Sequence, residues 1–137
     1  MVLVDTSVLI DYFRATETSA TQALDKLIDN GISILIGDLV LAELLQGTRS
    51  DQHAIKILKE LREYQSISIV GPECAILAAH NYRILRSLGI TTRKTIDCLI
   101  ATRCIMDDIP LLYTDRDFDP FVTHLGLVSI ISPETKP

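Results

Sequence analysis

The sequence lacks an apolar run of the roughly 18 residues that a membrane-spanning helix needs. Its first residues, MVLVD, also lack the basic region, long apolar stretch and cleavage site of a signal peptide. We therefore expect a soluble cytoplasmic protein with no membrane partner. The 137 residues, 47% hydrophobic and 23% charged, suit one globular domain. We expect this domain to cover residues 1–131 and the polar residues 132–137 to form a flexible tail.

Cysteine and histidine are scarce, and neither shows a catalytic or metal-binding spacing. The three cysteines are odd in number and have no C-x-x-C spacing, which argues against a disulfide framework and a zinc site. The three histidines have no spacing that pairs them, which argues against the acid–base pair of a metal-free ribonuclease. No G-x-S-x-G segment suggests a serine hydrolase.

Basic residues are too few for an ordinary nucleic-acid-binding surface. The chain has 13 Lys and Arg against 18 Asp and Glu, a net charge of −5. Phosphate backbones usually select a basic surface. Either the partner is not nucleic acid, or the negative charges are concentrated in a pocket that a cation neutralises.

Short β-rich segments alternate with amphipathic segments along the chain. We expect strands at 2–4, 32–36, 66–70, 111–113 and 127–131, and helices at 7–13, 17–30, 38–47, 51–63, 72–89 and 96–108. Asp5, Thr6 or Ser7 would cap the first helix, and Asp38 the third. This alternation predicts an α/β fold, a mostly parallel sheet with helices on both faces.

Acidic residues follow two of these strands. Asp5 ends the first strand, and Asp115, Asp117 and Asp119 follow the fourth. Ligands of such sheets bind beyond the carboxyl ends of the strands, so Asp5 and Asp115 belong at one edge. Taken alone, Asp5 is also explained as a helix cap and the later aspartates as a solvated turn with Phe118 anchored in the core.

Two further acids lie in apolar helices. Glu43 is surrounded by aliphatic residues in LVLAELL, which predicts a helix buried on all sides, where a carboxylate needs a partner or a metal. Asp97 begins TIDCLIATRCI, where an acid also favours the helix dipole. No lysine or arginine stands out as the partner, because Arg93 and Lys94 lie in a polar loop.

These four acids together predict a metal site. Carboxylates within about 5 Å repel each other, and one would take up a proton unless a cation held them. Oxygen ligands without suitable Cys or His spacing favour Mg²⁺ or Mn²⁺. Asp115 would close the pocket and Asp117 would lie near its rim.

The segments VLVDTSVLIDYF, LVLAELLQG, TIDCLIATRCI and LLYTDRDFDPF resemble, in this order, the motifs of the PIN domains. The likeness runs from Met1 to about Ile131 and is strongest to the VapC-type toxins of prokaryotic toxin–antitoxin pairs. It implies a five-stranded parallel sheet in the order 3-2-1-4-5 and a metal-dependent endoribonuclease. It also implies a homodimer and an antitoxin whose basic inhibitory segment enters the acidic cluster.

The resemblance assigns roles to individual residues. Asp5, Glu43 and Asp97 match the first three acids of the family, while Asp115 and Asp117 compete for the fourth position. Asp5, Asp97 and Asp115 would hold the metal. Thr6 or Thr114 would supply the accompanying hydroxyl.

Cleavage would proceed by metal-activated water attacking an RNA phosphodiester, which leaves a 5′-phosphate. Nearby basic residues would help to bind the RNA, although each is also explained as solvated surface: Arg14, Arg49, Arg93, Lys94 and Arg116. The alternative function is a non-catalytic regulatory module whose acidic pocket binds a phosphoryl group or a basic peptide. A receiver-like module would need a lysine at a late strand end, and the sequence has none there.

Overall fold

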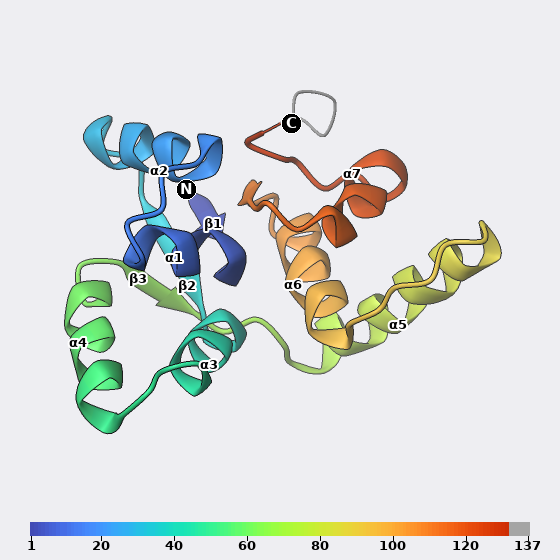
Figure 1. Ribbon diagram of the computed structural model, residues 1–137. Coiled ribbons are helices and arrows are strands. Elements are labelled where there is room, and N and C mark those ends of the chain that lie inside the picture. The colour runs from blue at the N-terminus through green and yellow to red at the C-terminus, as the bar shows by residue number, and fades with distance from the viewer. Residues whose placement is uncertain (132–137) are drawn as a thin grey trace.

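A short parallel sheet forms the centre of the computed structural model, which describes residues 1–131 (Figure 1). Its strands are β1 (Val2–Val4), β2 (Ile34–Gly37), β3 (Gln65–Ile67) and β4 (Leu111–Leu112), in the order β3-β2-β1-β4. All three pairings are parallel, as the sequence predicts. The predicted tail, residues 132–137, lies outside the described residues.

The predicted fifth strand is reduced to a single bridge beside β4. Leu111 pairs in parallel with Ser129. The Leu111 N–H donates to the Val128 carbonyl at 2.9 Å, and the Ile130 N–H donates to the Leu111 carbonyl at 3.1 Å. Because β4 has only two residues, the ladder ends there. Residues 127–131 therefore occupy the predicted edge position, and the described sheet has four strands rather than five.

Helices connect the strands and are capped largely by local side chains. They are α1 (Thr6–Phe13), α2 (Ser19–Asp29), α3 (Asp38–Gln46), α4 (Asp51–Leu61), α5 (Pro72–Ser87), α6 (Thr95–Met106), the 3-10 turn η1 (Arg116–Phe118) and α7 (Asp119–Leu125). Asp5 caps α1 by accepting from the Ser7 N–H, which confirms one of the predicted caps. Thr18 and Thr21 form a capping box at α2. Helix α7 was not predicted, because the acidic residues that begin its segment indicated a solvated turn.

Asp38 does not cap α3, because Gly37 takes the cap position. The Asp38 carboxylate instead accepts from the N–H groups of Leu39 and Ile69, at 2.8 and 3.0 Å. Arg103 holds the carbonyls of Ile69 and Val70, both at 2.7 Å. These side chains bind the backbone N–H and carbonyl groups that a longer β3 would need for pairing with β2. Strand β3 therefore ends at Ile67 and not at the predicted residue 70.

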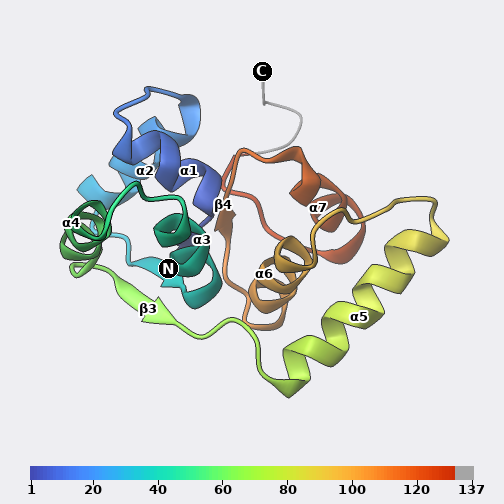
Figure 2. The ribbon, with the colours of Figure 1, turned by 60° about the horizontal axis from the view of Figure 1, so that its bottom comes forward.

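The two groups of helices cover opposite faces of the sheet. Figures 1 and 2 show α1–α4 on one side of the strands and α5–α7 on the other. Right-handed crossovers explain this, because the chain moves outward from β1 to β3 and then returns to β4. The arrangement leaves the carboxyl ends of β1 and β4 side by side, where the predicted acids follow.

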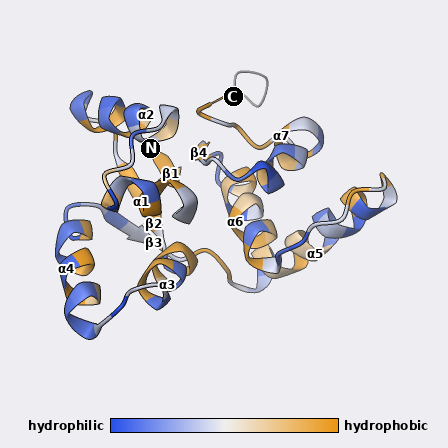
Figure 3. Ribbon diagram, in the orientation of Figure 1, coloured by the Kyte–Doolittle hydropathy of each residue, from blue (hydrophilic) through white to orange (hydrophobic). Residues whose placement is uncertain are grey.

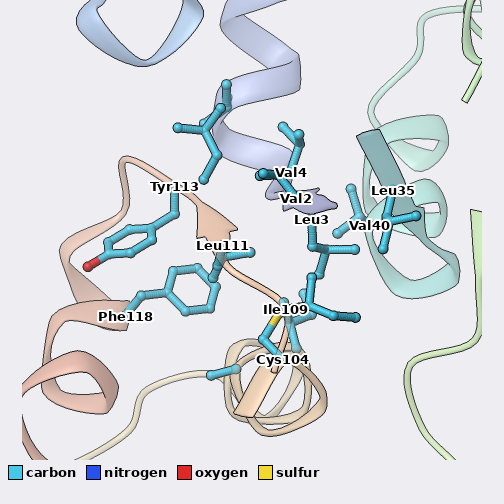
Figure 4. Packing of buried hydrophobic residues seen from close by; sticks show 14 of the residues in the cluster. Val2, Leu3, Val4, Leu35, Val40, Cys104, Ile109, Leu111, Tyr113 and Phe118 are labelled. Carbon is cyan, nitrogen blue, oxygen red and sulfur yellow. The ribbon is translucent and has the colours of Figure 1, made fainter. Parts of the chain in front are cut away.

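Aliphatic residues from all layers form the core (Figure 4). Leu3, Val4 and Leu111 are fully buried in the central strands. Phe118 is also fully buried and packs against Tyr113, with ring centroids 5.2 Å apart. The prediction that Phe118 anchors the acidic turn is thereby confirmed.

Helix α3 is apolar over most of its length, as Figure 3 shows, but it is not buried on all sides. Only Val40 and Leu44 are buried, Ala42 is exposed and Glu43 is half-buried. The prediction of a fully buried helix was therefore wrong. The helix packs mainly on α1 and β2, and these neighbours cover only part of its circumference.

Candidate functional site

Local structure brings the predicted acids to the carboxyl edge of the sheet. Asp5 follows β1 as the cap of α1, Asp97 lies in the first turn of α6, and Asp115 caps η1 just after β4. Glu43 projects from α3, and the Thr6 hydroxyl donates to its Oε1 at 3.0 Å. Each acid thus comes from a different segment of the chain.

Three carboxylates form a compact group. One oxygen from each of Asp97, Asp115 and Asp117 lies within 4.8 Å of the others. The structure therefore brings Asp97 and Asp115 together as predicted. It adds Asp117, which the sequence placed near the rim, while Asp5 is not a member of this group.

Asp5 is fixed beside the group by Ser7. The Ser7 hydroxyl donates to Asp5 Oδ2 at 2.6 Å, and the Ser7 N–H donates to the same oxygen at 3.2 Å. Burial raises the pKa of Asp5, and the Glu43 carboxylate raises it further. The sequence analysis considered Ser7 only as a helix cap. Its position two residues after a strand-end aspartate is the signal that could have revealed this contact.

Asp97 is the most strongly perturbed acid of the site. Burial raises its pKa to about 7, and the carboxylates of Asp5, Asp115 and Glu43 raise it as well. Its Oδ2 is buried and makes no hydrogen bond within the described residues. The other three predicted acids therefore all raise the pKa of Asp97, and Asp97 Oδ2 accepts no hydrogen bond within the described residues.

Lys94 is the cation at this centre, which the sequence analysis did not foresee. Its ammonium group lies 3.4 Å from Asp115 Oδ2 and 3.9 Å from Asp97 Oδ2. These two carboxylates raise the pKa of Lys94. The expectation that no lysine pairs with the acids was wrong, because Lys94 caps α6 and so stands next to the carboxyl edge.

Asp119, the third aspartate after β4, has a structural contact. The Tyr113 hydroxyl donates to Asp119 Oδ1 at 2.7 Å. Burial raises the pKa of Tyr113, and this hydrogen bond raises it too. The TDRDFD segment thus places Asp115 and Asp117 in the acidic group and Asp119 against the core.

The other predicted residues lie around the centre at different places. Thr114 is exposed, and its N–H donates to Ser7 Oγ at 3.4 Å, so Thr6 is the hydroxyl that contacts an acid directly. Arg93 is exposed in the loop before α6. Arg116 lines a cavity of about 250 Å³ beside Thr114, and Arg14 lines a different cavity, between α1 and α4.

Comparison with known proteins agrees with this arrangement. The PIN domain family profile matches residues 2–121. The chain belongs to the PIN domain family. This PIN domain protein is of the VapC type, because it is 30% identical over 132 residues to Ribonuclease VapC11 of Mycobacterium tuberculosis strain H37Rv, a match that covers 94% of this chain and 98% of the relative. VapC ribonuclease Mb1587 of Mycobacterium bovis matches to the same extent.

Solved structures share the fold of this PIN domain. VapBC2 from Rickettsia felis, bound to a DNA fragment from their promoter, has a TM-score of 0.75 at 22% identity, and the match covers 94% of this chain and 97% of that chain. FitAcB from Neisseria gonorrhoeae has a TM-score of 0.69 at 18% identity, with 94% and 96% covered. At these identities the similarity shows the fold alone.

The PIN domain has no membrane-spanning candidate among its described helices. None of those helices is both long enough and apolar enough to cross a bilayer.

The donor set of the acidic centre fits a hard divalent cation. Mg²⁺ and Mn²⁺ prefer carboxylate oxygens, and three carboxylates here converge within 4.8 Å. The unsatisfied Oδ2 of Asp97 is an oxygen without a hydrogen-bond donor, as a metal ligand would be. The PIN domain centre can therefore hold such an ion through Asp97, Asp115 and Asp117, with Asp5 beside them.

Proposed function

We propose that this protein is a Mg²⁺- or Mn²⁺-dependent endoribonuclease, the toxin of a VapBC-type toxin–antitoxin pair. One observation carries the proposal: Asp97, buried and with a pKa near 7, has an oxygen that accepts no hydrogen bond within the described residues, and it belongs to a group of three carboxylates. Such a group is poorly stable without a cation. The names of its relatives, VapC ribonucleases, indicate the substrate class.

The carboxylates have distinct tasks in the proposed reaction. Asp5, Asp97, Asp115 and Asp117 would supply the ligands of the ion. When bound, the ion would activate a water for in-line attack on an RNA phosphodiester and stabilise the leaving 3′-oxygen, giving a 5′-phosphate. Glu43, which accepts a hydrogen bond from Thr6, adds negative charge beside these ligands.

Lys94 supports the proposed control by an antitoxin. Its ammonium group already approaches both Asp97 and Asp115. A basic side chain from a partner would find the same complementary charges, so we propose that the antitoxin inserts an Arg or Lys here. VapBC2 of Rickettsia felis, whose fold this chain shares, is named as a VapBC pair, which supports an antitoxin partner.

Homodimerisation and a cytoplasmic location complete the proposal. Ile55 and Leu58 on α4 and Ile76 on α5 are large apolar residues exposed on the described monomer. A second copy of the chain would remove such surface from water. Light scattering on the purified protein tests this part, and a monomer at micromolar concentration would contradict it.

Cleavage of RNA by the purified, partner-free protein tests the proposed function. We expect total cellular RNA to be cut with Mg²⁺ or Mn²⁺ and to remain intact with chelator. The Asp5→Asn variant should lose at least a hundredfold in rate while its circular dichroism and unfolding midpoint show a folded protein. Full activity in this variant, or cutting that survives chelator, would overturn the proposal.

A further inference from the structure

A cavity of about 510 Å³ lies beside the acidic centre, between α1, α3 and α4. Its size falls within the range of small-ligand sites. Aliphatic side chains and the half-buried Phe13 line its apolar part. Its polar lining consists of Arg14, Glu43, Thr48, Arg49 and His53. The cavity therefore combines an aromatic surface with several hydrogen-bond donors.

The two arginines of the cavity have unneutralised charges. Arg14 and Arg49 are exposed, and neither forms an ion pair with a carboxylate of the described residues. Lys94 and Arg103, in contrast, are paired with aspartates. A guanidinium group binds phosphate oxygens through two parallel N–H bonds. Arg14 and Arg49 thus make this cavity complementary to an anion.

His53 adds a hydrogen-bond donor to the cavity. Its Nδ1 accepts a hydrogen bond from the Arg49 N–H at 3.3 Å. A neutral imidazole with an accepting Nδ1 carries its proton on Nε2. The ring therefore offers an Nε2–H donor in addition to the two guanidinium groups.

Glu43 connects this cavity to the acidic centre. It lines the cavity, accepts from Thr6 and acts electrostatically on both Asp5 and Asp97. An extended ligand in the cavity would therefore continue toward the carboxylates. A nucleic-acid strand has the required pattern, because it carries a phosphate at each nucleotide and a base that can stack on an aromatic ring.

We propose that the cavity between α1, α3 and α4 is a binding subsite for the RNA strand next to the scissile bond, with Arg14 and Arg49 on phosphates and Phe13 beneath a base. This inference rests on the proposed function and specifies how its substrate is positioned. It also gives this acidic chain two cations in the cavity that Glu43 connects to the acidic centre.

Charge favours RNA over a protein partner at this place. The proposed antitoxin segment is basic and seeks the carboxylates. Arg14 and Arg49 would repel such a segment, whereas they attract the phosphates of the substrate. An acidic peptide remains the competing ligand that the experiment must separate from RNA.

Fluorescence anisotropy of a labelled, single-stranded, mixed-sequence RNA of eight nucleotides tests the subsite. Binding is measured in chelator at several salt concentrations, and a gel confirms that the RNA stays intact. Arg14→Gln and Arg49→Gln should each weaken binding about five- to tenfold and reduce the slope of log affinity against log salt by about 1. Arg83→Gln, an exposed residue of α5 without an ion pair in the described structure, removes the same charge and should change neither quantity.

Three results would overturn the subsite. The first is no RNA binding by the wild type, or binding unchanged in Arg14→Gln and Arg49→Gln. The second is an equal loss in Arg83→Gln, which would show a general charge effect. The third is a peptide of eight glutamates that binds as tightly as RNA and depends on Arg49, which would assign the cavity to an acidic protein partner.

The Asp5→Asn variant separates the subsite from the proposed function. It should keep RNA binding that depends on Arg49 and lose cleavage. Such binding without cleavage by any form of the protein would refute the nuclease and retain the subsite. Cleavage together with RNA binding that does not change in Arg14→Gln and Arg49→Gln would refute the subsite and retain the nuclease.

Discussion

Single residues at the acidic centre have opposite effects on folding and on function. Asp97 is buried among like charges, and its Oδ2 lacks a hydrogen-bond donor. Burying such a group costs stability that a neutral residue would not lose. The Asp97 carboxylate is also where a cation would be most favourable. The proposed metal site therefore lowers the stability of the metal-free protein.

Asp97 should make the metal-free protein less stable as the pH rises. Its pKa is about 7 in the folded state against 3.8 in the unfolded state, so the folded state holds the proton more tightly. The stability linked to this proton is fully present below pH 3.8 and is lost as the pH rises through about 7. Asp97→Asn avoids this loss. In urea titrations with chelator, the variant should exceed the wild type at pH 8 by up to about 4 kcal/mol.

The same comparison at pH 5 is the control for Asp97→Asn. There the folded wild-type carboxyl is mostly protonated while the unfolded one is already mostly ionised, so the difference between the two proteins should fall to less than half of its value at pH 8 and vanish only below the unfolded pKa of 3.8. Mn²⁺ at pH 8 should stabilise the wild type and leave the variant almost unchanged. A variant that gains nothing at pH 8 would contradict the assignment of Asp97 as a buried acid whose pKa is raised by burial.

Lys94 should act as a partial substitute for the metal. Removing its charge by Lys94→Met leaves Asp97 and Asp115 without a neighbouring cation and raises the pKa of Asp97 further. We expect the metal-free variant to melt below the wild type at pH 8 and to gain more from Mn²⁺. Arg83→Met, at an exposed position of α5, is the matched control. Equal metal-induced shifts in melting temperature for all three proteins would show that Lys94 does not compete with the ion.

At the scale of elements, local patterns predicted most helices and the alternation of strands with helices, and the family resemblance implied the strand order, but neither predicted the ends of the strands. Apolar periodicity marked α2, and β-branched runs marked β2, because these signals depend on neighbouring residues alone. The end of β3 depends on Arg103 and Asp38, which approach it from distant segments. The partial exposure of α3 likewise depends on which elements pack on it. No local pattern contains this information.

The candidate site was predictable to a similar degree. Strand ends and apolar helices pointed to Asp5, Glu43, Asp97 and Asp115, and the fold brings them into one electrostatic neighbourhood. The pairing of Lys94 with Asp115 could not be read from spacing. It depends on the direction in which the lysine side chain leaves its backbone, which only the folded geometry determines.

Gly37 is essential to the junction of β2 and α3 because of its missing side chain. A Cβ at this position would lie 2.7 Å from Ile69 Cδ1 and 2.8 Å from Ile69 Cγ1. Ile69 is fully buried, so it has little room to move. We expect Gly37→Ala to lower the free energy of unfolding by about 1–3 kcal/mol in a urea titration.

A double-mutant cycle isolates this contact. Ile69→Ala removes both clashing atoms, so the cost of Gly37→Ala should fall markedly when Ile69 is already alanine. Additive effects of the two substitutions would mean that the close approach does not limit the junction.

At the scale of the whole molecule, the distribution of charge is compatible with the proposed RNA substrate although the chain is acidic. Its net charge of −5 opposes nucleic acid, yet three carboxylates are gathered where an ion can neutralise them. The cavity beside them presents two unpaired arginines. Substrate binding should therefore depend on the metal at one end of the site and on a small basic subsite at the other.

The chemistry of the RNA ends tests the central claim most directly. Fragments produced by the wild-type protein with Mn²⁺ are analysed for their terminal groups, beside samples with chelator and with Asp97→Asn. The account predicts 5′-phosphate and 3′-hydroxyl ends in the wild-type sample and no fragments in the other two. Fragments with 2′,3′-cyclic phosphates and 5′-hydroxyls, formed equally in chelator, would contradict it, because they would show attack by the RNA's own 2′-hydroxyl without the acidic centre.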